Sequence, residues 1–336
     1  MSRNAHLKRA ALAAVFLCAL PFAAILASLF FGRYFLSPAE VLSALFRPDA
    51  VSRAAVVTVR QLRLPRALAA AFVGASLSAS GAAFQSVFRN PLVNSGILGV
   101  SNGAGFGACL AIVFFGGGAF TYGLSFLFGV AAVALSYFAG RIAKNQTVIT
   151  LILGGTIVSA FFSALVSILK YIADPYSQLP AITFWLMGSF ASVGTAQLRA
   201  LVPMTLGMAL IFLCRRRIDA LSMGTREASS LGVDVRLYAF LVIGGATLCT
   251  ASAVCISGTI GWVGLVVPHV ARMLVGSENA KLIPASVSLG AGFLVLIDLL
   301  SRCLTGSEIP IGILCALIGT PFFVYLLKRT KGGSWL

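Results

Sequence analysis

Three arginines recur at intervals of three residues in the segment RQLRLPR, at Arg60, Arg63 and Arg66. Residues three apart share one face of a helix, so these side chains are predicted to form one basic surface. A fourth arginine, Arg302, follows Asp298 by four residues, which is the spacing of an ion pair within a helix. Guanidinium groups bind carboxylates and phosphates through paired hydrogen bonds. The pattern therefore predicts recognition of an acidic ligand or partner, with anchoring at a membrane interface as the alternative.

Outside this cluster the sequence offers no set of residues suited to catalysis, metal binding or nucleotide binding. The histidines His6 and His269 are far apart, and the seven cysteines stand singly without a CxxC pair. No GxxxxGK[ST] sequence occurs, so the chain has no phosphate-binding loop with which to hydrolyse ATP. We therefore expect no enzyme activity, no metal and no cofactor in this chain.

The composition indicates a protein that lies in a membrane. Of the 336 residues, 59% are hydrophobic and 10% are charged, whereas a soluble domain has about 25% charged residues. The apolar residues form blocks of about 20, the length of a helix that spans a bilayer. We predict a single all-α transmembrane domain, 1–336, with ten spans at 10–32, 67–88, 95–115, 119–140, 147–169, 199–214, 237–257, 259–275, 283–304 and 309–327.

Basic residues predict how these spans are oriented. The net charge is +16, but the lysines and arginines flank apolar blocks and form no basic run interleaved with aromatics, so we predict no nucleic-acid binding. Ten spans put both termini on one side, and the positive-inside rule places that side in the cytoplasm. Residues 33–66 then form an outer loop, and residues 215–236, RRRIDALSMGTREASSLGVDVR, form a cytoplasmic loop.

The cytoplasmic loop 215–236 is too polar to enter lipid. It is predicted to hold two short helices, at about Asp219–Met223 and Thr225–Leu231, with Thr225 as the cap of the second and Gly232 at its end. Such a loop is either an ordinary solvated connection or a docking element that receives motion from a separate motor protein.

Two short matching segments suggest an inverted repeat. Ser80-Gly81 and Ser257-Gly258 are each followed by a proline ten residues after the glycine, at Pro91 and Pro268. The two places are five spans apart, so the copies would face opposite sides of the membrane, as in many transporters.

Three longer motifs resemble those of a known family. Residues 63–108, RLPRALAAAFVGASLSASGAAFQSVFRNPLVNSGILGVSNGAGFGA, and residues 256–276, ISGTIGWVGLVVPHVARMLVG, resemble the signatures of the iron-siderophore, haem and vitamin B12 permeases of ABC importers. Residues 308–327, EIPIGILCALIGTPFFVYLL, resemble the last span of that family. The chain departs from the family at residues 276–281, GSENAK, where a Gly-Asp-His-Arg run is common, and we interpret this difference as loop variation.

The resemblance implies a homodimeric ten-helix permease in the cytoplasmic (inner) membrane of a bacterium or archaeon. Two cytoplasmic ABC ATPase subunits, which bind ATP and Mg, would attach below, and a periplasmic or lipid-anchored binding protein would dock above. Matching motif positions imply docking of the binding protein at Arg63, Arg66 and Arg302. They imply ATPase docking at Ala220, Ser222, Gly224, Glu227, Ala228, Leu231 and Gly232, and a gate at Asn90, Pro91, Leu92, Thr147 and Val148.

The predicted function is import of a metal chelate, that is a ferric siderophore, haem or corrinoid, by alternating access. An importer of the same architecture for an oxyanion such as molybdate is one alternative. An ion-coupled secondary carrier is the other, and the scarcity of acids within the spans disfavours it, because Asp298 is the one clear intramembrane acid.

Overall fold

All regular secondary structure in the part of the chain that the structure describes is helical. The computed structural model describes residues 3–142 and 148–329. The all-α prediction is confirmed, and each of the ten predicted spans contains one long helix, although residues 95–99 and 259–262 at the starts of two spans are not helical. These helices are α1 (Arg3–Phe30), α4 (Leu64–Val87), α5 (Val100–Phe115), α6 (Ala119–Ile142), α7 (Val148–Ile172), α9 (Leu201–Met223), α11 (Val235–Ser257), α12 (Val263–Val275), α13 (Asn279–Cys303) and α14 (Ile311–Arg329).

By length and composition, six of the described helices can cross a membrane: α4, α6, α7, α9, α11 and α13. The other four, α1, α5, α12 and α14, contribute shorter apolar stretches. Short segments connect these long helices. They are α2 (Pro38–Phe46), η1 (Pro48–Ala50), α3 (Arg53–Val56), the π-helical η2 (Val57–Arg63), α8 (Gln178–Met187), η3 (Thr195–Ala200) and α10 (Thr225–Ser230).

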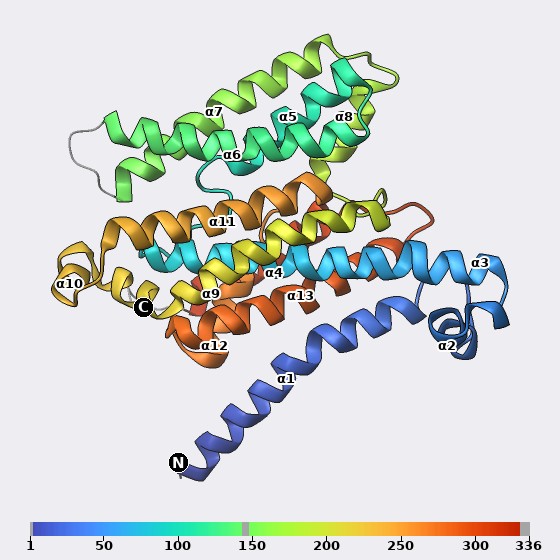
Figure 1. Cartoon of the computed structure of the whole chain (residues 1–336), viewed down its shortest axis with the longest axis horizontal. Helices are drawn as coiled ribbons and strands as arrows, with labels where there is room; N and C mark the ends of the chain where they lie inside the picture. The colour runs from blue at the N-terminus through green and yellow to red at the C-terminus, as the bar shows by residue number, and fades with distance from the viewer. Residues whose placement is uncertain (1–2, 143–147, 330–336) are drawn as a thin grey trace.

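Helix α4 lies at the centre of the molecule, and 89% of its most apolar window is buried. It packs against α9, α11, α12 and α13 (Figure 1). Two glycines on α4 permit this close approach. A Cβ at Gly81 would lie 1.9 Å from the carbonyl oxygen of Gly264 on α12, and a Cβ at Gly74 would lie 2.1 Å from that of Gly290 on α13. Small residues therefore bring these backbones into direct contact, as is common between membrane helices.

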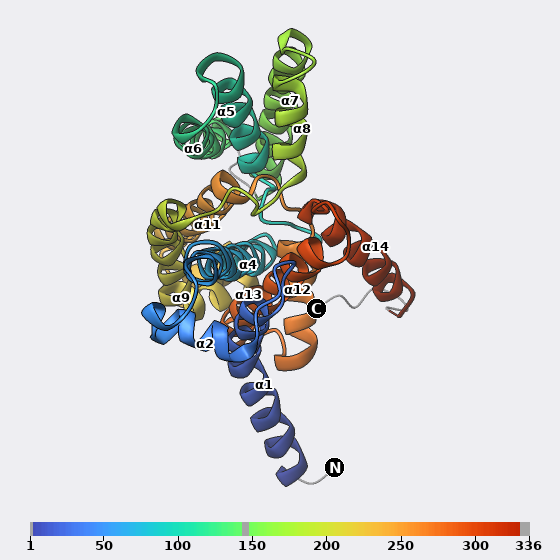
Figure 2. The ribbon, with the colours of Figure 1, turned by 90° about the vertical axis from the view of Figure 1, so that its right-hand side faces the viewer.

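Helices α5 to α8 form a second group beside the central one (Figure 1). This group joins the central group through contacts of α11 with α5 and α6. Helix α14 stands at the side of the bundle (Figure 2), where it contacts α12, α13 and α8. Helix α8 was not predicted, because its ten residues are too short to be found in a search for spans.

The predicted loops 33–66 and 215–236 lie at opposite ends of the molecule (Figure 1). We call the end with α2 and α3 the outer end, and the end with α10 the inner end, after the predicted topology. The start of α1 also lies at the inner end. Which end faces the cytoplasm remains a prediction.

The prediction for residues 215–236 was partly wrong. Residues 219–223 are not a separate helix, because α9 continues without a break to Met223. Its extension has buried apolar residues at helical spacing, Cys214, Ile218 and Leu221, which pack on the neighbouring helices. The second predicted helix is confirmed as α10, although the residue at its N-cap is Gly224 and not Thr225.

The matching dipeptides Ser80-Gly81 and Ser257-Gly258 do not occupy equivalent structural positions. Gly81 lies in the middle of α4, whereas Gly258 ends α11 with a φ of 67°. Pro91 follows α4 in a turn, but Pro268 lies inside α12. The interpretation of these two dipeptides as copies of one motif was therefore wrong.

Candidate docking and gating site

At the outer end, Arg66 joins three parts of the chain. Its Nε donates to both carboxylate oxygens of Asp298 on α13, at 2.9 and 3.1 Å. Its two Nη atoms donate to the two oxygens of Glu308, at 2.8 and 2.9 Å. Since Asp298 is fully buried and Arg66 is 9% exposed, these contacts fix α4 to α13 and to the loop before α14.

The predicted ion pair within α13 is confirmed, with 3.8 Å between Arg302 Nε and Asp298 Oδ2. Arg302 Nη2 also donates to the carbonyl oxygen of Ser28, at 2.6 Å. Arg63 Nη1 donates to the carbonyl oxygen of Leu29 at 2.7 Å, and its Nη2 donates to that of Tyr34. Both arginines are buried and hold the end of α1 against the bundle.

The prediction that Arg60, Arg63 and Arg66 form one surface was wrong. Arg60 is exposed and donates to the carbonyl oxygen of Leu45 at 2.6 Å, whereas Arg63 and Arg66 are turned inward to different partners. The π-helical segment Val57–Arg63 breaks the α-helical spacing on which the prediction depended.

The three predicted docking arginines nevertheless lie together. Arg63, Arg66 and Arg302 border one pocket of about 160 Å³ at the outer end, with Arg33 and Glu308. Burial raises the pKa of the Glu308 carboxyl, but the bonds and charge of Arg66 outweigh this effect, and the pKa lies below its usual range. Sequence reasoning missed Glu308, although it opens the third motif. Whether these arginines dock a binding protein stays a prediction.

At the inner end, α10 presents a mixed surface. Ala228 is fully buried and anchors the helix. Leu231, just after α10, is 62% exposed, and Met223, just before α10, is 60% exposed. Glu227 and Gly232 are also exposed. The remaining predicted docking residues lie beneath, with Ala220 and Ser222 half-buried and Gly224 buried.

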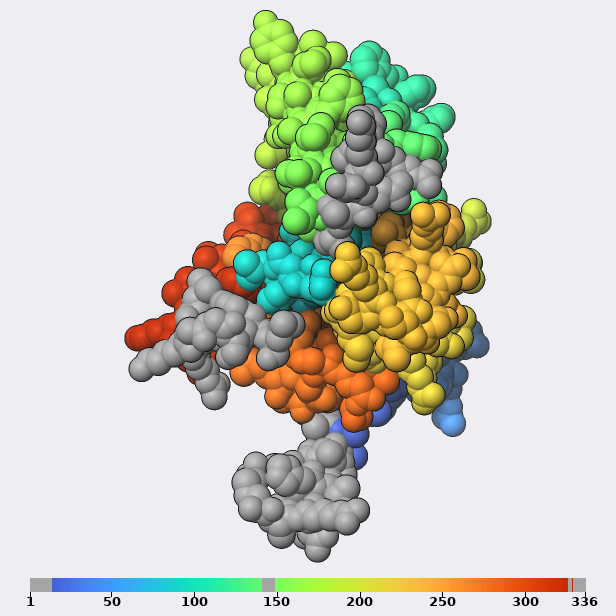
Figure 3. Space-filling view, turned by 90° about the vertical axis from the view of Figure 1, so that its left-hand side faces the viewer, coloured from blue at the N-terminus to red at the C-terminus, as the bar shows by residue number. Residues whose placement is uncertain are grey.

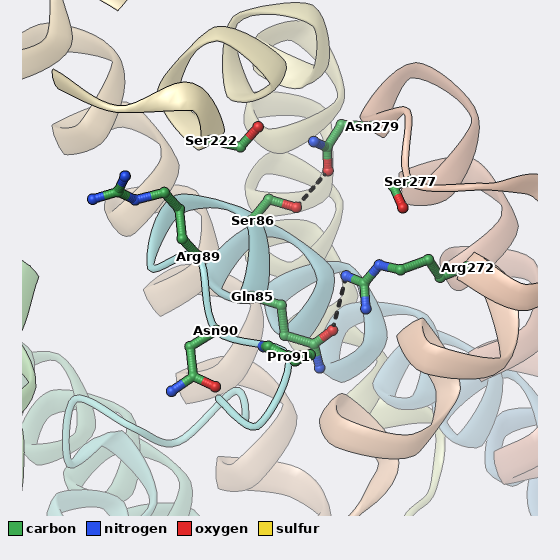
Figure 4. Close-up of a pocket in the computed structure, with 9 residues that line it drawn as sticks. All are labelled: Gln85, Ser86, Arg89, Asn90, Pro91, Ser222, Arg272, Ser277 and Asn279. Atoms are coloured by element: carbon green, nitrogen blue, oxygen red, sulfur yellow. Dashed lines mark hydrogen bonds between the residues drawn. The ribbon is translucent and has the colours of Figure 1, made fainter. Parts of the chain in front are cut away.

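A chain of hydrogen bonds leads from this segment to α4, and Figure 4 shows its last link, between Asn279 and Ser86. Asp219, near the end of α9, accepts hydrogen bonds at 2.8 Å from both the backbone N and the Nδ2 of Asn279, the first residue of α13. Asn279 Oδ1 in turn accepts from Ser86 Oγ at 2.7 Å, one residue before α4 ends. Sequence reasoning gave none of these three side chains a functional role, since their contacts join residues far apart in the sequence.

The turn between α4 and α5, residues 88–99, carries the predicted gate residues. Asn90 Oδ1 accepts from the backbone N of Leu92 at 2.9 Å, which shapes the tip of the turn, and Leu92 is 54% exposed there. Gln85 Nε2 donates to the carbonyl oxygens of Val93 in the turn, at 3.2 Å, and of Leu265 on α12, at 3.3 Å. The turn is thus attached to α4 and α12 at its base and free at its tip.

The structure brings part of the predicted gate and part of the predicted docking segment together. Asn90, Pro91 and Ser222 border one pocket at the inner end. On this face the segment around α10, the turn 88–99 and the ends of α12 and α13 lie side by side (Figure 3, yellow, cyan and orange). Thr147 lies outside the described residues, and Val148 begins α7.

A model of the FecCD transport family matches residues 19–329. This chain belongs to the FecCD transport family. A molybdate import system permease of Haemophilus influenzae is 43% identical over 91% of this chain and 92% of its own. A probable iron chelatin transport system permease of Helicobacter pylori is 38% identical over 82% of this chain and 84% of its own. A solved structure described as an inward-facing metal-chelate type ABC transporter is 40% identical, with a TM-score of 0.83 over 93% of this chain and 97% of its own.

The FecCD match confirms the resemblance found in the three motifs. The chain is therefore a multi-pass membrane protein and a permease-type subunit, from a family in which ATP hydrolysis belongs to a separate subunit. Permeases of ABC importers work with a separate ATPase and a substrate-binding partner, so both ends of the molecule are relevant to function.

Proposed function

We propose that this chain is the permease subunit of an ABC importer that carries a metal chelate into the cytoplasm by alternating access. The observation that supports this most directly is the hydrogen-bond chain from Asp219 through Asn279 to Ser86. It joins the proposed motor-docking segment to the helix that carries the gate turn. A permease needs such a connection if ATP hydrolysis in a separate subunit is to move the gate turn.

The working unit would be a homodimer with two cytoplasmic ATPase subunits, which supply ATP and Mg chemistry that this chain lacks. The exposed Leu231 and Met223 offer the motor an apolar contact, and Ala228 keeps α10 packed on the permease. Movement of α10 and the end of α9 then pulls on Asn279 and, through Ser86, on the base of the turn at Asn90. Between the Asp219 carboxylate and α4 lie only the Asn279 amide and the Ser86 hydroxyl, so this series of hydrogen bonds would pass the motion on by displacement of these groups.

At the outer end, acidic residues of a binding protein would dock on the basic pocket. Arg63, Arg66 and Arg302 form its floor, while Arg33 and Arg60 are exposed at the same end. Opposite charges at an interface mainly accelerate encounter and fix the register of the partners. Docking therefore depends on the exposed arginines for contact and on the buried ones for shape.

The test is uptake by proteoliposomes that contain this chain, its ATPase and its loaded binding protein. Asn279→Ala breaks the hydrogen-bond chain, so uptake of a labelled ferric chelate should fall at least about tenfold while the ATPase still copurifies. The matched control is Lys281→Ala, which removes an exposed side chain two residues away that bonds Glu278. Uptake without ATPase subunits, or full uptake by Asn279→Ala, would refute the proposal.

A second cargo is an oxyanion such as molybdate, and the 43% identity to the Haemophilus influenzae molybdate permease favours it. Either cargo would require the same ATPase subunits and a binding protein that docks at the same outer surface. Uptake of radioactive molybdate and of a ferric chelate by the same proteoliposomes, each with its own binding protein, distinguishes them.

A further inference from the structure

Helix α2, in the outer loop, is apolar on two opposite faces. On one face Val41 and Ala44 are fully buried and pack against α3 and η2. On the other face Ala39, Leu42 and Phe46 follow the three- and four-residue spacing of a single helical stripe. All three are exposed, and Phe46 is 78% exposed. A helix in an aqueous loop carries polar residues on its free face, so this stripe indicates a second apolar environment.

Helix α2 also lies across the direction of the long helices. It is seen nearly end-on at the outer end in Figure 1, whereas Figure 2 shows it lengthwise and α4 end-on. Helix α2 is therefore parallel to the plane of the membrane that the long helices cross. Because α3 and η2 lie on its bundle side (Figure 1), the exposed stripe points sideways from the bundle. A binding protein that docks from outside would approach along the bundle axis and not from this side.

The segment that joins α1 to α2 is also apolar, and it is held in place. Tyr34 and Phe35 are both exposed, Phe35 by 88%. Arg63 Nη2 donates to the carbonyl oxygen of Tyr34, and Arg60 Nη2 donates to that of Leu45 near the end of α2. The aromatic rings are thus presented in fixed positions where a predicted span ends. Exposed aromatic rings at this level are typical of the interface between membrane and water.

The charge of the outer loop favours an anionic surface. Residues 33–66 contain six arginines and only two acids, Glu40 and Asp49. Arg47 caps the end of α2 and Arg53 begins α3, and both are exposed. The positive-inside rule disfavours such an excess of arginine on the outer side. Basic residues close to a membrane surface are attracted by the phosphates of anionic lipids.

We propose that α2 is an interfacial anchor, in which Ala39, Leu42 and Phe46 insert into the outer leaflet while Arg47 and Arg53 bind phosphates of anionic lipid headgroups. The segment just before α2 borders the outer pocket, so the anchor fixes the rim of that pocket at the membrane surface. The proposal rests on the membrane location and predicted topology of the chain. It depends on neither the cargo nor the motor, so it can fail or hold independently of the proposed function.

A photo-crosslinker at position 46 identifies what covers the stripe. Full-length chain with p-benzoylphenylalanine in place of Phe46 is irradiated in nanodiscs of phosphatidylcholine and phosphatidylglycerol and analysed by mass spectrometry. The expected product is a phospholipid adduct on the peptide that contains position 46. The matched control carries the same crosslinker in place of Leu231, an exposed apolar residue of the inner loop. Its lipid adduct should be at least about tenfold weaker, because that loop is predicted to lie in water.

The other possible occupants of the stripe give different products. A crosslink from position 46 to a second copy of this chain would overturn the anchor. So would absence of the lipid adduct, equal lipid adducts at positions 46 and 231, or replacement of the lipid adduct by a crosslink to the binding protein when that protein is added. A lipid adduct that the loaded binding protein leaves unchanged supports the anchor.

The headgroup contacts have a separate test. Leu42→Cys is labelled with an uncharged polyethylene glycol maleimide, and the modified peptide is measured by mass spectrometry. Adding Arg47→Glu and Arg53→Glu together should raise the labelling rate at least about threefold in discs with phosphatidylglycerol, and less than about twofold in phosphatidylcholine alone. Arg226→Glu, at an exposed position of α10, is the control and should leave the rate unchanged in both lipids.

A thermal melt establishes that each labelled variant is folded. Equal effects of the Arg47 and Arg53 changes in the two lipids would show that these arginines do not bind anionic headgroups. Labelling of Leu42→Cys in discs as fast as that of Asp49→Cys, an exposed position in η1, would show that the stripe lies in water and would overturn the anchor.

Discussion

Arg66 Nη2 lies 2.8 Å from Asp298 Oδ1, although 232 residues separate the two in the sequence. The same carboxylate lies 3.8 Å from Arg302, so one fully buried acid faces two buried arginines. The outer end of α4 and the outer end of α13 are therefore held together by charge.

Replacing Asp298 should destabilise the protein far more than replacing an exposed acid. Asp298→Ala removes the carboxylate that faces the buried guanidinium groups of Arg66 and Arg302 and leaves Arg302 without its acidic partner. Breaking a buried pair in this way costs about 3–5 kcal/mol. Unfolding in mixed micelles with increasing dodecyl sulfate measures this change. The control is Asp49→Ala in η1, an exposed position, where a change below about 0.5 kcal/mol is expected. Equal stability of the two variants would show that the outer ion cluster contributes little.

The Glu308 carboxylate should make stability depend on acid pH. Burial raises its pKa and Arg66 lowers it more, so the net pKa in the folded chain is below that in the unfolded chain. A depressed pKa contributes stability that is fully present above the unfolded value, about 4.3, and is lost as the pH falls through the folded value. Melting temperatures measured from pH 6 to pH 3 should fall more for wild type than for Glu308→Gln. Parallel curves for the two proteins would contradict the assignment.

Gly81 should tolerate no side chain. A Cβ there would lie 1.9 Å from the carbonyl oxygen of Gly264, so Gly81→Ala must push α4 away from α12. We expect a loss of at least about 2 kcal/mol in unfolding free energy, within the range of overpacked cores. The same substitution at Gly244 on α11, where nothing lies within 4 Å of the added carbon, is the control. Gly244→Ala should be neutral or stabilising, because alanine favours helix over glycine.

Leu231 should be the main apolar contact of the motor. It is 62% exposed at the end of α10, and burial of a leucine side chain contributes about 1.5–3 kcal/mol. Leu231→Asp should therefore weaken ATPase binding at least about tenfold, as measured by biolayer interferometry with the immobilised permease. Ser230→Asp places the same charge at the adjacent exposed position and should have a much smaller effect. A similar loss in both variants would mean that added charge, and not the lost leucine, weakens binding.

The positions of the long helices could be predicted from the sequence, because a helix that spans a bilayer needs an apolar block of about 20 residues. Each of the ten predicted spans contains a helix, and the three motifs led to the family. The end of α9 was misjudged because hydropathy alone marks Arg215 as the end of a span. Burial of Ile218 and Leu221 against neighbouring helices carries the helix further.

What the sequence determined by itself is thus the class of protein, its spans and the segment that forms α10, since these depend on local composition and spacing. Only the tertiary structure decided what the charged residues do. Arg63, Arg66 and Arg302 look like a free basic surface in sequence, yet they are buried against partners such as Asp298 and Glu308. The Asp219–Asn279–Ser86 chain was equally hidden. Long-range pairs of this kind depend on which helix ends meet, and no local pattern encodes that meeting.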